Sequence, residues 1–111
     1  MRLALAAFAG LLLAARAQAA PLPLFDSAAY CAHVGFVGMT LSTVILDGCV
    51  EAEAAARVDL ARSWAALKPD EQAHCASAAG FAGDGSYALM RSCIARLRAD
   101  AALDRAEAAA N

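Results

Sequence analysis

Bulky side chains and prolines are scarce in this sequence. Although 61% of its 111 residues are hydrophobic, it has one tryptophan, two tyrosines and four phenylalanines, and much of the hydrophobic fraction is alanine. Alanine favours helices but adds little volume to a core. Proline occurs only at positions 21, 23 and 69, and no segment shows the alternation of a half-buried strand. The sequence therefore predicts an all-α protein with a thin hydrophobic core.

Basic residues do not outnumber acidic ones either. The formal net charge is −2, and it falls to −4 when Arg2 and Arg16 near the beginning of the chain are left out. Nucleic acids and anionic membrane surfaces attract proteins through clustered cations. The acidic balance therefore argues against both as partners.

No apolar run is long enough to span a membrane. The longest, Leu3–Ala15, has about 13 residues, whereas a spanning helix needs about 20. Small residues at Ala17 and Ala19 follow it, in the pattern that a signal peptidase recognises. We expect residues 1–19 to be a signal peptide, cleaved after Ala19 or alternatively after Ala17. Residues 20–111 would then form a single α-helical domain, periplasmic or secreted, without stable membrane insertion.

The four cysteines form two equally spaced pairs. Cys31 and Cys49 are 18 positions apart, and so are Cys75 and Cys93. Disulfides are a common way to stabilise an exported domain whose core is small. Four cysteines allow three connectivities. The equal spacing favours the pairs Cys31–Cys49 and Cys75–Cys93.

This spacing is part of a longer internal repeat. Cys31 corresponds to Cys75 and Ser42 to Ser86, each 44 positions later. A single helical hairpin cannot bury its apolar face alone, whereas two can bury theirs against each other. We therefore expect two tandem disulfide-stapled helical hairpins packed as a small four-helix domain. The repeat units span about 25–57 and 69–101, and a frayed tail follows at about 102–111.

Capping residues and glycines divide each unit into a short helix, a Gly-rich turn and a longer helix. Asp26 or Ser27 can cap the first helix and Thr40 or Ser42 the second, while Pro69 fits the first turn of the third and Ser86 caps the fourth. The expected helices cover 27–34, 41–67, 69–79 and 86–101. The expected buried face of the second helix is Leu41, Ile45, Cys49 and Ala52, continued by Leu60, Trp64 and Leu67. That of the fourth is Met90, Cys93, Ile94, Leu97 and Ala101.

The C-terminal half carries a recognisable pattern: Trp64, Leu67-x-Pro69, Cys75, Gly85-Ser86-Tyr87, Leu89 and Cys93-Ile94. It resembles an uncharacterised family of small secreted bacterial proteins with duplicated Cys and Ser-Tyr motifs. The first unit departs from the pattern, because it has Ser42-Thr43 where the family has Ser-Tyr. The resemblance implies the helical fold and the compartment, and it implies no activity and no catalytic residue.

Residues suited to metal binding or catalysis do not form a consistent site. Cys31, His33, His74 and Cys75 are types that bind zinc, but the histidines are not equivalent in the two units and cysteines in disulfides cannot ligate. No serine has an identifiable histidine and acid partner, and Glu51 and Glu53 point to different helix faces. We expect neither an enzyme nor a protein with a metal or other cofactor.

The turn before the fourth helix and the single tryptophan remain as candidate contacts. The segment 83–86 can cradle an anion at a helix N-terminus, but it lacks the lysine of a phosphate-binding loop, so a turn with a cap is favoured. Trp64 can either seal the junction between the hairpins or stand exposed as an anchor for a partner. The candidate partner contacts are Trp64, Asp84, Ser86 and Tyr87.

These observations favour a secreted or periplasmic, non-enzymatic helical module that binds an envelope protein. The alternative is an envelope stress chaperone of the acid type, which would expose apolar surface when its carboxylates protonate. A small enzyme or a metal-binding protein is a third and weaker reading.

Overall fold

The computed structural model describes residues 20–80 and 84–111. The expected signal peptide, residues 1–19, lies outside these ranges, as do residues 81–83 of the second Gly-rich turn. Within them the chain forms four α-helices, a small hairpin of two strands and one 3₁₀ turn. In chain order these are α1 (Ser27–Gly35), β1 (Phe36–Val37), β2 (Thr40–Leu41), α2 (Thr43–Ser63), η1 (Trp64–Ala66), α3 (Pro69–Ala79) and α4 (Tyr87–Ala110).

Side-chain caps set the beginnings of three helices. The Asp26 carboxylate accepts a hydrogen bond from the Ala29 amide at 3.0 Å and begins α1. Ser42 begins α2, its hydroxyl accepting from the Ile45 amide at 3.4 Å. Its repeat equivalent Ser86 begins α4 in the same way, through the Leu89 amide at 3.2 Å. Such caps satisfy amides that lack a partner within the helix. The predicted equivalence of Ser42 and Ser86 is therefore confirmed.

The two predicted disulfides are present. Cys31 pairs with Cys49 and Cys75 with Cys93, with Cα–Cα distances of 5.5 and 5.6 Å. The first ties α1 to α2 and the second ties α3 to α4, so each lies within one helical hairpin. The predicted fold class, two disulfide-stapled helical hairpins in an all-α domain, is confirmed.

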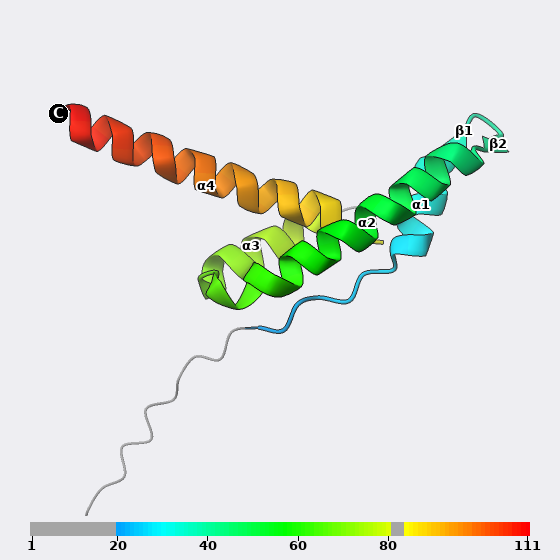
Figure 1. The fold of residues 1–111 in the computed structure, drawn as a ribbon, viewed down its shortest axis with the longest axis horizontal. Helices are drawn as coiled ribbons and strands as arrows, with labels where there is room; N and C mark the ends of the chain where they lie inside the picture. The colour runs from blue at the N-terminus through cyan, green and yellow to red at the C-terminus, as the bar shows by residue number, and fades with distance from the viewer. Residues whose placement is uncertain (1–19, 81–83) are drawn as a thin grey trace, which may run out of the picture.

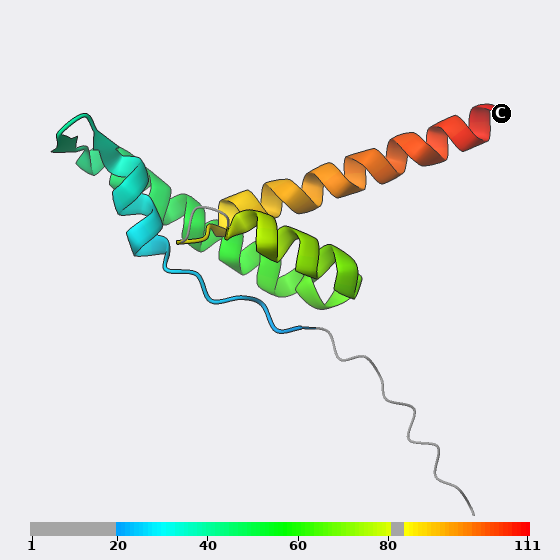
Figure 2. The same cartoon turned by 180° about the vertical axis from the view of Figure 1, so that it is seen from behind.

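α2 is the helix that joins the two hairpins. α1 and the β1–β2 hairpin lie at one end of α2, and η1 and α3 lie at its other end (Figures 1 and 2). α2 also packs against the beginning of α4, while the rest of α4 extends away from the body. The buried core lies where the second half of α2 meets α3 and the first turns of α4. It consists of Ala56, Leu60, Trp64, Leu67, Cys75, Ala79, Tyr87, Met90 and Ile94.

The first part of the expected buried face of the second helix was wrong, whereas Leu60, Trp64 and Leu67 in its second part are buried as expected. Leu41 lies in β2 rather than in a helix, and Ile45 and Ala52 are exposed. Glu53 and Ala56 are the buried positions that the prediction missed on α2. A helix turns by about 100° per residue, so choosing position 52 in place of 53 rotates this part of the predicted face away from the core.

Two further details differ from the sequence-based prediction. The chain forms a short antiparallel pairing, Phe36 with Leu41 and Val37 with Thr40, where no strand was expected. Gly38 adopts a positive φ of 64° in the turn between them, a conformation that favours glycine. α4 continues as a helix to Ala110 beyond the expected end at 101, and its residues from 98 onward are exposed, Ala101 included.

Candidate functional site

Three of the four predicted partner contacts are buried. Trp64 is 5% exposed and Tyr87 2%, Ser86 is fully buried, and Asp84 is half-buried. Trp64, Ser86 and Tyr87 therefore do not form an exposed surface in this structure, and their role as partner contacts stays a prediction. Of the two readings of Trp64, the structure agrees with the core position between the hairpins. The reason is a segment before α1 that lies over these side chains.

Trp64 binds that segment through its indole nitrogen. The Nε1–H group donates a hydrogen bond to the Ala20 carbonyl at 2.7 Å. The backbone carbonyl of Trp64 accepts from the Gln72 side-chain amide at 2.8 Å, which ties η1 to α3. A buried indole needs a partner for its N–H, and here a residue 44 positions earlier supplies it.

Tyr87 binds the same segment through its hydroxyl. The hydroxyl donates to the Pro23 carbonyl at 2.9 Å and accepts from the Phe25 amide at 3.0 Å. The Tyr87 and Phe25 rings pack in a tilted arrangement with centroids 5.0 Å apart. Residues 20–26, called the strap below, are thus held by one side chain from η1 and one from α4.

Gly85 makes room for the strap. Its φ is +68°, and a Cβ atom built there would collide with the Phe25 ring. Both the backbone conformation and the close approach therefore require glycine. This gives a physical reason for the glycine of the Gly85-Ser86-Tyr87 motif.

Gly85→Ala is expected to lower the free energy of unfolding by about 2–3 kcal/mol, because it adds backbone strain and displaces Phe25. Gly48→Ala is the matched control, since an added Cβ on this helical glycine meets nothing within 4 Å. The control should leave stability unchanged or raise it by about 1 kcal/mol. Urea unfolding followed by circular dichroism measures both. Equal effects of the two substitutions would contradict the role given to Gly85.

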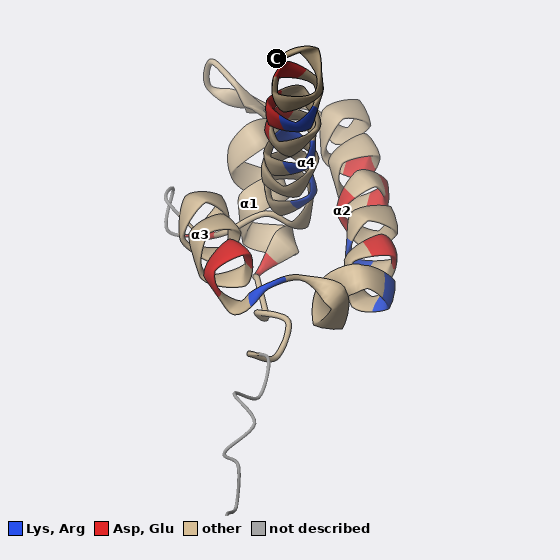
Figure 3. Cartoon of the chain, turned by 90° about the vertical axis from the view of Figure 1, so that its left-hand side faces the viewer, with Lys and Arg blue, Asp and Glu red and all other residues tan. Residues whose placement is uncertain are grey.

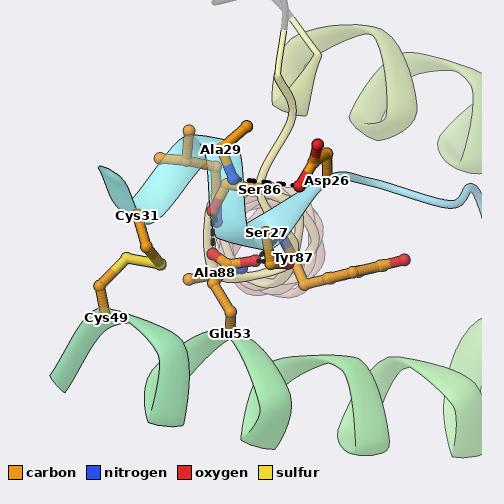
Figure 4. Close-up of a disulfide and its surroundings, with 10 residues drawn as sticks. Asp26, Ser27, Ala29, Cys31, Cys49, Glu53, Ser86, Tyr87 and Ala88 are labelled. Carbon is orange, nitrogen blue, oxygen red and sulfur yellow. Dashed lines mark hydrogen bonds between the residues drawn. A yellow bond between two sulfur atoms is a disulfide. The ribbon is translucent and has the colours of Figure 1, made fainter. Parts of the chain in front are cut away.

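Glu53 is a buried carboxylate at the junction of three helices. Its side chain is 2% exposed and accepts four hydrogen bonds (Figure 4). The donors are the Ser27 hydroxyl at 3.0 Å, the Ser86 hydroxyl, the Tyr87 amide at 2.8 Å and the Ala88 amide at 3.3 Å. They come from the first residue of α1 and from the start of α4. Glu53 therefore caps α4 from another helix, where the positive end of the helix dipole favours an anion.

The sequence-based reasoning missed this residue, treating Glu53 only as a neighbour of Glu51. The signal was available in its spacing: Glu53 follows Cys49 by four positions and precedes Ala56 by three, on one helical face. An acid at a position otherwise occupied by buried residues indicates a buried carboxylate with partners.

The cluster around Glu53 connects α2 to the starts of α1 and α4. Both serine hydroxyls donate to the Glu53 carboxylate, which also accepts the Tyr87 and Ala88 amides. His33 and His74 are exposed. Within the described parts of the chain, His, Cys, Asp and Glu side chains do not gather in threes as a metal site would require.

Two shallow grooves follow the sides of α4. The α3–α4 groove, about 300 Å³, is lined by His74, Ser92 and Arg96 among others. The α2–α4 groove, about 210 Å³, contains the Asp59–Arg91 ion pair at 3.0 Å. That pair is about half exposed and so contributes little to stability. Neither groove brings together residues that would bind or transform a defined ligand.

A cluster of exposed apolar side chains lies at the end of the first hairpin. Seven large apolar side chains are exposed within 12 consecutive positions, and Met39 is 97% exposed. No acidic residue, lysine or arginine occurs from position 34 to 46. Charged residues lie along α2, α3 and α4 instead (Figure 3). We call this surface the apolar tip: Val34, Phe36, Val37, Met39, Leu41, Val44 and Ile45.

Comparison with known proteins adds no relative. No protein-family model matches the chain, and no curated protein or solved structure is significantly similar to it. In residues 20–80 and 84–111, no helix has both the length and the apolar character needed to cross a bilayer. Two disulfides in one short chain are typical of proteins in oxidising compartments.

Proposed function

We propose that this protein is a non-enzymatic helical module of the periplasm or the extracellular space that binds an envelope protein through the apolar tip. The exposed tip is the observation that carries the proposal. Isolated exposed apolar residues are ordinary, but a contiguous group of large ones is typical of an interaction surface.

The tip is held as a defined shape rather than as a loose loop. The backbone N–H of Ser42 donates a hydrogen bond to the Gly35 carbonyl at 2.8 Å, which closes the hairpin where β1 and β2 meet the helices. The Cys31–Cys49 disulfide ties α1 to α2 behind it. A preorganised surface loses less conformational entropy when a partner binds. This rigidity supports recognition of a partner by the tip.

The charge distribution indicates the chemistry of that partner. Because the tip has no charged side chain, its favourable contacts are apolar, and a charged partner surface would lose hydration without gaining an ion pair. His33 and Asp47 flank the tip and are exposed, so a polar rim surrounds it. We therefore propose a protein partner with an apolar patch bordered by polar groups.

Site-specific photo-crosslinking tests this proposal. A photoreactive residue is placed at position 39 in the tip or, as a control, at position 103, where Leu103 on α4 is exposed and distant in sequence. In the cell envelope, position 39 is expected to crosslink to a single protein species identified by mass spectrometry. Adding Phe36→Ser should reduce that crosslink at least about tenfold, whereas Val58→Ser, an exposed change on α2, should not.

The proposal would be overturned if positions 39 and 103 gave the same adducts, or if Phe36→Ser left the crosslink unchanged. Purified protein with hydrolytic turnover that depended on one side chain would contradict the non-enzymatic assignment.

The exposed tip also supports the second candidate, a stress chaperone that holds unfolded clients. The two candidates differ in their dependence on pH. If the protein binds the same amount of a hydrophobic dye at neutral and at acidic pH, a permanent docking surface is favoured. A marked rise on acidification, with helix content retained, favours the acid-type chaperone.

A further inference from the structure

The strap lies against the body of the protein in the way that a bound peptide lies in a groove. Its hydrogen bonds to the body run through strap backbone groups: the carbonyls of Ala20 and Pro23 accept, and the Phe25 amide donates. The groups that meet them are the Trp64 indole N–H and the Tyr87 hydroxyl. Backbone contacts of this kind do not depend on the side chains of the strap, so another segment with the same backbone path can make them.

Two of the three large apolar side chains of the strap face the core, and the third faces solvent. Leu22 and Phe25 are half-buried and pack against the core, whereas Leu24 between them is 83% exposed. Pro21 and Pro23 restrict the backbone and have no N–H to satisfy. The strap is therefore an extended segment with two prolines, held through two apolar side chains three positions apart.

This combination matches a general mode of peptide recognition. Extended proline-containing segments lose little conformational entropy on binding, and aromatic side chains form the grooves that hold them. Trp64 and Tyr87 provide the aromatic surface and donors to carbonyls, and Gly85 provides the space for the apolar side chain at position 25.

The strap can leave without dismantling the domain. It contains neither helix nor strand and precedes both disulfides in the chain. Release of residues 20–25 breaks three hydrogen bonds and exposes two half-buried side chains, and it does not require Asp26 to leave its capping position on α1. Irregular segments of this kind open at lower free energy than the packed helices.

We propose that Trp64, Gly85 and Tyr87 form a binding groove for an extended, proline-containing segment of a partner protein. The strap occupies this groove in the free protein, and the partner segment enters when the strap leaves. The groove is separate from the apolar tip, so the proposal does not rest on the tip's function.

The test uses the folded chain with a loosened strap and a synthetic peptide, Ala-Pro-Leu-Pro-Leu-Phe-Asp, with the sequence of residues 20–26. Leu22→Ala and Phe25→Ala, separately, weaken the strap without changing the groove. The NMR signal of the Trp64 indole N–H reports occupancy of the groove. We expect saturable binding of the peptide to both variants, at least about tenfold tighter than to the unmodified chain, whose own strap competes.

Two controls address specificity. A peptide with serine in place of its leucine at position 22 and its phenylalanine at position 25 should bind at least about tenfold more weakly. Tyr87→Phe in the loosened background should weaken binding of the original peptide about fivefold to tenfold, because it removes the hydroxyl that meets Pro23 and Phe25.

Several results would overturn the proposal. One is absence of peptide binding at millimolar concentration while the Trp64 signal shows a detached strap. Another is loss of helix content in both loosened variants, which would make the strap part of the core rather than a replaceable occupant. A third is equal binding of the serine peptide. A fourth is dimerisation of the variants without peptide binding, which would make a second copy the occupant.

Discussion

Met90→Asp is expected to lower the free energy of unfolding by about 4–5 kcal/mol, enough to unfold a small domain near physiological temperature. Met90 is fully buried on the second turn of α4, in the core formed with α2 and α3. An aspartate there would place a charge without a partner among apolar side chains. Few large side chains build this core, so little remains to compensate.

Leu89→Asp is the matched control for Met90→Asp. Leu89 is the preceding residue on the same helix, but its side chain is partly exposed. An aspartate in the first turn of a helix is also favourable for the helix dipole. We expect a change below about 1 kcal/mol in urea unfolding measured without reductant. A comparable loss in both variants would show that α4 is not packed in the register described.

Glu53→Ala is expected to lower the free energy of unfolding by about 3–4 kcal/mol. The change leaves the hydroxyls of Ser27 and Ser86 and two α4 amides without their acceptor, three of them from residues at the start of α4. Each buried donor without a partner costs about 1–3 kcal/mol, reduced where water can reach it. Glu53→Gln keeps one acceptor oxygen and should lose less.

Glu51→Ala is the control that distinguishes loss of the Glu53 hydrogen bonds from the general effect of removing one negative charge. Glu51 carries the same side chain two positions earlier but is exposed. Its removal should change stability by less than about 0.5 kcal/mol. Urea unfolding at neutral pH measures the three variants, and near-ultraviolet circular dichroism reports whether Tyr87 keeps its packed environment. Equal stabilities of Glu53→Ala and Glu51→Ala would contradict the proposed role of Glu53.

The elements predicted best are those set by local chemistry. Asp26, Ser42 and Ser86 each cap a helix through an amide three residues later, so the signal and its effect lie within one turn. Pro69 begins α3 at the position expected of it. The disulfides also follow from spacing, because an equal separation in two repeat units indicates equivalent hairpins.

The candidate contact residues were recognised as unusual, and three of the four are buried in the structure. Trp64 and Tyr87 looked suitable for a partner, and in the structure they bind the chain's own strap. The tip was missed partly because two of its residues, Leu41 and Ile45, were assigned to a buried helix face. Exposure depends on what packs against a segment, and no other described element of the chain covers β1 and β2.

The sequence by itself determined the helical class, the helix caps and the pairing of the cysteines, because each depends on neighbouring residues or on a repeated interval. Only the tertiary structure decided that Glu53 reaches the start of α4, that residues 20–26 cover Trp64 and Tyr87, and that the apolar tip remains exposed. Each of these depends on contacts, or on their absence, between segments tens of residues apart. The periodicity of a single helix does not contain that information, since it shows which residues share a face but not which segment that face will meet.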